Sequence, residues 1–400
     1  MRAKWRVVGG LMWAARCASA LAQPTFQGLG ALPGYQSSYG FAISQDGSTV
    51  VGSSGAFAFR WRQATGMQNL GTLSAGVSST AWAVSADGTV VVGESWVIEG
   101  PTVHAFRWSA GTGIVDLGTL PGGNESAAYG VSADGSVVAG YSEVLANERI
   151  FRWTPGDGMQ SLGALPPAGY SRGGSVSADG STIVGLSGNG GTTTDRAVRW
   201  TSSTGLQDLG VPLGCMSTSA RAVSADGSVV VGETGCAGFA AFRWTAAGGM
   251  QGLLGMPPAT AVSADGSVVV GFSTGTRVWT PQRGTMNLQT LLGPVVPAGW
   301  TLSQGLGVSG DGLRIVGWGQ NPAGRSEAWL AVLTPELLWC TANCDNSTTA
   351  PALNVNDFVC FLNKFAAGDT TANCDQSTTT PSLNVNDFTC FLNAFAAGCT

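Results

Sequence analysis

The sequence predicts an all-β protein, a seven-bladed β-propeller of four-stranded blades, followed by a small, disulfide-rich and mainly α-helical C-terminal module. First, a unit of about 45 residues recurs seven times along the chain. Second, 60 glycines and only 11% charged residues suit short strands joined by tight turns better than amphipathic helices. Third, six of the nine cysteines lie after residue 339, where the composition changes and a domain boundary is expected.

The most regular element of the unit is Ser-x-Asp-Gly, followed by a β-branched run that ends in glycine. An Asp-Gly pair between two β runs is a strong hairpin signal, because glycine accepts positive φ and aspartate bonds nearby backbone N–H groups. We interpret the aspartates as structural turn residues, since every copy places them identically; the alternative is a metal- or sugar-binding ring. They are Asp46, Asp87, Asp134, Asp179, Asp226, Asp265 and Asp311.

Two further elements complete the unit. One is a strand reading Ala-Phe-Arg-Trp, whose Trp recurs at 61, 108, 153, 200, 244, 279 and 329. The other reads like Met-Gln-Asn-Leu-Gly-Thr-Leu at 67–73. Four short strands in 40 to 50 residues describe a propeller blade. Because Phe and Trp two residues apart share one side of a strand, we expect them to fill the space between blades. The arginine between them either stacks on a neighbouring Trp or donates to a loop carbonyl.

The two ends of the repeat array indicate a closed ring. After Trp329 the chain never returns to the Leu-Gly-x-Leu strand, whereas residues 26–32 supply that element before the first unit begins. We therefore predict that the N-terminal strand at 26–32 completes the last blade and leaves no unpaired edge. The propeller is expected to span residues 23–333, with a linker at 334–339.

These units resemble the HAF family of extracellular repeats, named for a His-Ala-Phe strand motif. The resemblance covers about residues 26 to 330, and His104-Ala105-Phe106 is the copy that carries the histidine. It implies an extracellular location and no particular biochemical activity.

Residues 1–22 read as a secretory signal peptide, with Arg2, Lys4 and Arg6 before a short apolar run and Ala20-Leu21-Ala22 at its end. Cleavage before Gln23 would leave 15 basic against 24 acidic residues, a formal charge near −9, which argues against a nucleic-acid partner. No later stretch reaches the roughly 18 apolar residues of a membrane span. We expect an exported protein, extracellular or at the cell surface, with the periplasm as the alternative.

His104 is the single histidine of the sequence, which excludes a multi-histidine metal site and leaves little room for a histidine base beside a nucleophile. We therefore assign no catalytic residue. The leading hypothesis is a non-catalytic propeller that recognises an extracellular ligand, such as a polysaccharide, or fills a structural role. The alternative is an extracellular carbohydrate-active hydrolase or lyase that uses two carboxylates on the propeller. Several carboxylates at the channel mouth would favour the enzyme.

Residues 340–400 contain a 30-residue duplication in which oxygen-bearing side chains precede an apolar-periodic segment, as in a calcium loop followed by a helix. The module resembles dockerin domains of the cysteine-bearing type. That resemblance implies a calcium site in each repeat, although Asn replaces the first Asp and three extra residues replace the tight glycine turn. The implied ligands are Asn343, Asp345, Ser347, Asn354 and Asp357, then Asn373, Asp375, Ser377, Asn384 and Asp387. A disulfide-fixed turn without the ion is the alternative.

The same resemblance implies that the module docks on a cohesin-like or other cell-surface protein. The implied contacts are Val355 and Asn356 in one copy and Val385 and Asn386 in the other, with an exposed Phe or Leu as anchor. The alternative is that these apolar residues only pack the two helices together.

The eight cysteines that remain after the leader predict disulfides in an exported chain. Cys215 and Cys236 flank the fifth hairpin and are expected to pair. In the module, the simplest scheme has one bridge within each repeat and one that joins the ends. The candidates there are Cys340, Cys344, Cys360, Cys374, Cys390 and Cys399.

Overall fold

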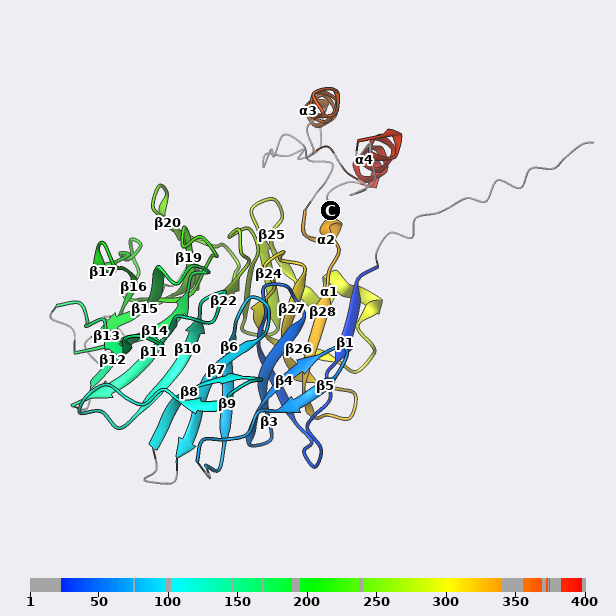
Figure 1. Cartoon of the computed structure of the whole chain (residues 1–400). Coiled ribbons are helices and arrows are strands. Elements are labelled where there is room, and N and C mark those ends of the chain that lie inside the picture. The colour runs from blue at the N-terminus through cyan, green and yellow to red at the C-terminus, as the bar shows by residue number, and fades with distance from the viewer. Residues whose placement is uncertain are drawn as a thin grey trace, which may run out of the picture.

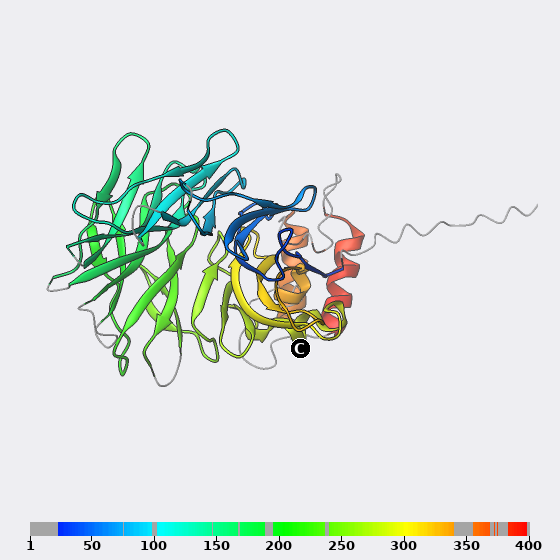
Figure 2. The same cartoon turned by 90° about the horizontal axis from the view of Figure 1, so that it is seen from below.

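The protein is a closed seven-bladed β-propeller, as the repeats predict. The computed structural model describes residues 23–74, 76–97, 102–145, 147–166, 169–188, 195–236, 240–339, 355–368, 372, 374 and 383–397. Its strands form seven antiparallel four-stranded sheets, each made of strands that follow one another in sequence except the last. Figures 1 and 2 show these sheets arranged around a ring, with the two long helices near the C-terminus outside it.

One strand of each blade lies innermost. These seven strands contact one another in a closed cycle, so each touches the innermost strand of the blade before and of the blade after. They surround the central channel. They are β2 (Ser38–Ile43), β6 (Ser79–Val84), β10 (Ser126–Val131), β14 (Tyr170–Val176), β18 (Thr218–Val223), β22 (Ala259–Val262) and β26 (Thr301–Val308).

The remaining strands follow outward in each blade. The second strands are β3 (Thr49–Ser54), β7 (Val90–Val97), β11 (Val138–Val144), β15 (Thr182–Gly188), β19 (Val229–Thr234), β23 (Val269–Phe272) and β27 (Arg314–Gln320). The third strands are β4 (Phe57–Arg62), β8 (Thr102–Ser109), β12 (Asn147–Thr154), β16 (Arg196–Thr201), β20 (Ala241–Thr245), β24 (Thr276–Thr280) and β28 (Ser326–Val332). The outermost strands are β5 (Gly66–Asn69), β9 (Gly113–Asp116), β13 (Gly158–Ser161), β17 (Gly205–Asp208), β21 (Gly249–Gly252), β25 (Gly284–Asn287) and β1 (Thr25–Gly28).

The ring closes through the N-terminal strand, as predicted. Strand β1 pairs antiparallel with β28, from Thr25 opposite Val332 to Gly28 opposite Trp329. In Figure 1 the two strands lie side by side although one begins and the other ends the propeller. Leu29 and Leu32, just after β1, are buried against the first and last blades. The closing segment therefore contributes both backbone hydrogen bonds and apolar packing.

The Phe and Trp of the third strands pack between neighbouring blades. Phe59 is fully buried and Trp61 nearly so, and both belong to a core cluster that also includes Val316 of the last blade. The intervening arginines reach the next blade: Arg60 Nε, Arg107 Nε and Arg243 Nε donate to the glycine carbonyl of the following Asp-Gly turn. The Arg60 guanidinium also lies 5.5 Å from the Trp108 ring centroid. Both alternatives for these arginines are thus realised.

The Ser-x-Asp-Gly turns join into a ring of their own. The residue between Ser and Asp, or the Asp itself in the first blade, donates its backbone N–H to the matching carbonyl of the next blade, over distances of 2.9 to 3.1 Å. The chain of bonds runs through Ala86, Ala133, Ala178, Ala225, Ala264, Gly310 and the Gln45–Asp46 pair, and so returns to its start. A cycle of backbone hydrogen bonds therefore fixes the end of the channel where the innermost strands terminate.

Helices are few in the described part of the chain. They are α1 (Leu288–Leu292), a 3₁₀ turn η1 (Gly293–Val295), α2 (Pro335–Leu338), α3 (Val355–Ala366) and α4 (Val385–Ala397). Helix α2 lies in the segment expected as a linker, and its Leu338 is buried in the cluster that includes the sixth and seventh blades. Helices α3 and α4 of the C-terminal module pack through Phe361 and Phe391, whose stacked rings are 4.2 Å apart.

Candidate functional site

Every innermost strand carries a β-bulge at the same place. The pairing with the second strand skips one residue in each blade, so that this residue has no partner across the ladder. A bulge re-aims the side chain of its extra residue. The seven skipped residues, called the bulge residues below, are Phe41, Trp82, Tyr129, Gly174, Arg221, Thr260 and Leu306.

The glycine that ends each β-branched run lies opposite the bulge. In the first blade Gly52 pairs with Gly40, directly before bulge residue Phe41. A Cβ at Gly52 would collide with the carbonyl oxygen of Tyr39, and the equivalent glycines of the other blades meet the same obstacle. The repeated glycine is therefore a consequence of the close backbone approach at the bulge.

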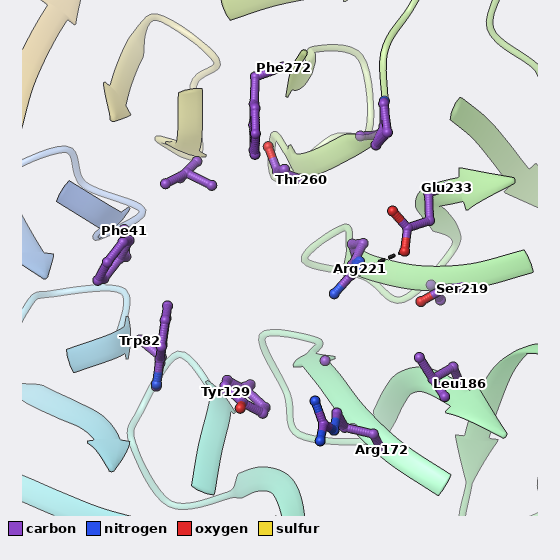
Figure 3. Close-up of a pocket in the computed structure, with 16 residues that line it drawn as sticks. Phe41, Trp82, Tyr129, Arg172, Leu186, Ser219, Arg221, Glu233, Thr260 and Phe272 are labelled. Atoms are coloured by element: carbon purple, nitrogen blue, oxygen red, sulfur yellow. Dashed lines mark hydrogen bonds and ion pairs between the residues drawn. The ribbon is translucent and has the colours of Figure 1, made fainter. Parts of the chain in front are cut away.

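All seven bulge residues line one pocket of about 460 Å³ in the central channel. Its size lies within the roughly 300–1,000 Å³ range of small-molecule sites. Leu186, Glu233 and Phe272 of the second strands complete the wall on the side of the fourth to sixth blades. Figure 3 shows the labelled side chains around this space, contributed by blades on every side. One ring of sequence positions thus forms the pocket.

The first three blades give the pocket an aromatic wall. The rings of Phe41 and Trp82 stack with centroids 4.6 Å apart, and Tyr129 meets Trp82 edge-on at 5.7 Å. Burial, with the Glu94 carboxylate adding to it, raises the pKa of the Tyr129 hydroxyl, so Tyr129 stays neutral at ordinary pH. We call Phe41, Trp82 and Tyr129 the aromatic arc.

The fourth and fifth blades give it a charged wall. Arg221 Nη2 donates to Glu233 Oε1 over 2.6 Å, and the two side chains are 51% and 35% exposed. Arg172 forms an ion pair with Glu148 and holds its guanidinium 4.5 Å from the Tyr141 ring centroid. We call Arg172, Arg221 and Glu233 the polar arc. In Figure 3 it lies across the pocket from Phe41 and Trp82.

The seven aspartates of the Ser-x-Asp-Gly motif lie in turns, as interpreted from the sequence. Each accepts a hydrogen bond from the serine hydroxyl two residues earlier and from the backbone N–H two residues later. Hydrogen bonds from Ser132 and Ser136 lower the pKa of Asp134 to about 2, and equivalent bonds lower the pKa of Asp179 and Asp226. The pocket lining contains none of these aspartates among the described residues.

The proposed metal ligands are only partly described. Asn343, Asp345, Ser347, Asn354, Asn373, Asp375 and Ser377 lie outside the described residues. Asp357 and Asp387 are buried in the first turns of α3 and α4. Asp387 Oδ2 accepts from the backbone N of Asn384 over 2.8 Å, while Asn384 Oδ1 accepts from Asn386 N. The Asn384 side chain thus bonds the second residue of α4 and the Asp387 side chain bonds back to Asn384 N, so both residues cap α4.

The proposed partner contacts are exposed. Val355 and Asn356 begin α3, Val385 and Asn386 begin α4, and both valines are about 70% exposed. The expected phenylalanine anchors lie elsewhere: Phe361 and Phe391 are buried between the helices, where Phe358, Phe365, Phe388 and Phe395 pack against them. Phe361 and Phe391 therefore pack the two helices together, as the packing alternative expects.

Two predicted disulfides are present in the described residues. Cys215 and Cys236 are bonded, with Cα atoms 4.4 Å apart. Cys374 and Cys390 are bonded within the second repeat, with Cα atoms 5.8 Å apart. Cys360 is also disulfide-bonded. Cys340, Cys344 and Cys399 lie outside the described residues.

The pocket itself was not predicted from the sequence. A signal was nevertheless present, because small residues flank one variable position shortly before each Ser-x-Asp-Gly. Gly40-Phe41-Ala42, Ala81-Trp82-Ala83 and Ala220-Arg221-Ala222 show the pattern. Alternation alone cannot reveal the bulge, because an extra residue shifts the register by one.

These observations define the class of protein: a closed seven-bladed propeller with one composite pocket in its channel. Solved propellers are similar to it in fold. An oligogalacturonate lyase in complex with manganese is 14% identical over 79% of this chain and 98% of its own, with a TM-score of 0.51. An oligogalacturonate lyase from Vibrio parahaemolyticus (9% identical, 79% and 98%, TM-score 0.49) and a TolB from Agrobacterium tumefaciens (15% identical, 74% and 90%, TM-score 0.40) also match.

At these identities the similarity shows the fold alone. No family model matches the chain, and no curated protein matches it in sequence.

In the described part of the chain, the helices are all too short or too polar to cross a membrane.

Proposed function

We propose that this protein is an exported, non-catalytic propeller that recognises an extracellular ligand in its central pocket and is displayed through its C-terminal module. One observation carries the proposal: the framework of the blades repeats, whereas the seven bulge residues that meet in the pocket all differ. A channel with only a structural role would need only side chains that fill its space. A set of chemically distinct groups around one cavity is typical of a binding site.

The chemistry of the lining supports recognition over hydrolysis. Glu233 is the one carboxylate among the described lining residues, and Arg221 is already paired with it. A carboxylate-based glycosidase needs two such groups about 5 to 9.5 Å apart at the scissile bond.

A turnover assay on a panel of soluble polysaccharides tests this choice. We expect the secreted protein to bind without releasing reducing ends or unsaturated products. Turnover that is abolished by Glu233→Gln, but kept in a Glu143→Gln control, would replace the binding proposal by the enzyme. Glu143 is a matched control because it lies on β11, outside the pocket lining.

For the tail, we propose a docking face on each helix of the module. Val355, Val359 and Leu362 of α3 are exposed at spacings of four and three residues, which places them on one side of the helix. Val385 and Leu392 repeat the pattern on α4. An exposed apolar row on a small domain supports a protein partner. We propose a cohesin-like cell-surface protein, held by either of two equivalent faces.

Charged substitutions test this docking. Val355→Glu and Val385→Glu, singly and together, are introduced into the full chain, and retention on the cell surface is measured. We expect each single variant to be retained and the double variant to be released, because either face suffices. Retention of a folded double variant at the wild-type level would contradict the proposal. Leu213→Glu, a fully exposed propeller position, serves as the control.

We also propose weak calcium binding by the two loops of the module, at about 10⁻⁴ M, the range of extracellular calcium modules. Asp357 and Asp387 would supply carboxylate oxygens, although Asp387 already caps α4. Titration of the full chain with Ca²⁺, followed by the melting of the module, tests this. A melting temperature that is the same in millimolar Ca²⁺ and in chelator would contradict it.

A further inference from the structure

The pocket has two chemically distinct sides, and together they define a ligand class. This inference rests on the proposed function, because it names what the central pocket recognises. The aromatic arc lies on the first three blades and the polar arc on the fourth and fifth. A ligand that fills the pocket must satisfy both sides at once.

The aromatic arc suits a ring whose face carries C–H groups. The stacked pair of Phe41 and Trp82 and the edge-on Tyr129 form a continuous apolar wall. Aromatic faces carry the negative part of a quadrupole, which attracts the weakly positive hydrogens of carbon atoms bonded to oxygen. A pyranose ring presents such hydrogens on one face and its hydroxyls around the edge.

The polar arc suits hydroxyl groups. Arginine only donates hydrogen bonds and an ionised carboxylate only accepts them, whereas a hydroxyl does both. The Arg221–Glu233 pair therefore offers two neighbouring hydroxyls one donor and one acceptor. An anionic ligand would be repelled by the Glu233 carboxylate. A wholly apolar ligand would remove water from the ion pair without replacing its hydrogen bonds, which is costly.

We propose that the central pocket binds a neutral sugar residue of an extracellular saccharide, with its C–H face on the aromatic arc and its hydroxyls on Arg221 and Glu233. Arg172, held by Glu148 and Tyr141, adds a positioned donor on the same side. No bond is made or broken, so the pocket acts in recognition alone.

Calorimetric titration of the full mature chain tests the proposal. The probes are neutral cello-, xylo-, manno- and galacto-oligosaccharides, a uronic-acid oligosaccharide set, and the amphipathic anionic dye anilinonaphthalene sulfonate. We expect at least one neutral oligosaccharide to bind, and Arg221→Gln and Glu233→Gln each to weaken its binding tenfold or more. The Arg221 side chain is about half exposed and the Glu233 side chain about a third exposed, so these variants should fold. Trp82→Ala is the aromatic test, and its melting temperature checks its folding.

Trp96→Ala is the matched control, because Trp96 is 42% exposed and lies outside the pocket lining. Its binding should equal that of the wild type. If only uronic-acid probes or the dye bind, and pocket variants abolish that binding, the sugar class is wrong while the pocket function stands. If a saccharide binds but Arg221→Gln, Glu233→Gln and Trp82→Ala all bind it normally, the central pocket is not the site. Failure of every probe to bind overturns the sugar assignment.

Discussion

The propeller and the C-terminal module are stabilised in different ways. In the propeller, seven cores between blades share the apolar burial, and a cycle of backbone hydrogen bonds links the turns. The module has one small cluster around Phe361 and Phe391 and at least one internal disulfide. A repeated structure distributes its stability over many equivalent contacts, whereas a small domain depends on covalent cross-links such as disulfides.

Deletion of the strand that closes the ring should produce the largest loss of stability. Deleting residues 23–33 removes the β1–β28 pairing and the burial of Leu29 and Leu32, which we expect to cost roughly 5 kcal/mol or more. It also exposes the edge of the last blade, so aggregation should rise. Thermal melting and light scattering measure this against a chain that begins at Gln23. Unchanged melting and solubility would refute closure as a source of stability.

Truncating a core side chain in the propeller or in the module tests whether the two regions unfold independently. Phe59→Ala should destabilise the propeller by about 3–5 kcal/mol, because Phe59 is fully buried between blades. Phe391→Ala should melt the module and leave the propeller transition in place. Calorimetry with two resolved transitions checks both variants. Val115→Ala, an exposed position on β9, should change neither transition by more than about 0.5 kcal/mol. One shared transition that shifts in both core variants would show that the units are coupled.

Disulfide removal should affect the module more than the propeller. The Cys374–Cys390 bridge spans 16 residues, and its loss through Cys374→Ser with Cys390→Ser should destabilise the module by about 3 kcal/mol. The pair Cys215→Ser with Cys236→Ser removes a bridge of similar span, 21 residues, from a propeller hairpin that the neighbouring blades also hold. In denaturant melts, the midpoint of the module should fall further on loss of its disulfide than the midpoint of the propeller falls on loss of Cys215–Cys236. Equal shifts of the two transitions would remove this distinction.

Acid should weaken the turns, with a small effect for each residue. The folded pKa of Asp134, about 2, is below the unfolded value, so its contribution is present above about pH 4. That contribution is lost as the pH falls through the folded value near 2. Melts between pH 5 and pH 2 should show Asp134→Asn losing less stability than the wild type over this window. An identical pH dependence would mean that Asp134 does not stabilise the turn through its charge.

The sequence by itself determined the number of blades, the strand order and the closure of the ring. These follow from local chemistry repeated seven times: an Asp-Gly pair makes a hairpin wherever it stands, as at Asp46 and Asp134. The missing strand after Trp329 and the extra one before the first unit also belong to the sequence. The Cys215–Cys236 pairing follows from its position around one hairpin.

Only the tertiary structure determined that a pocket forms in the channel and that the central phenylalanines of the module are buried. Phe41, Trp82 and Arg221 are far apart in the chain, and they meet because a bulge in each innermost strand aims one side chain into a shared channel. Neither their convergence nor the burial of Phe391 is encoded within one repeat. The alternation of a strand and the periodicity of a helix predict on which face of the element a residue lies. Which other residues that face contacts depends on how separate elements pack together.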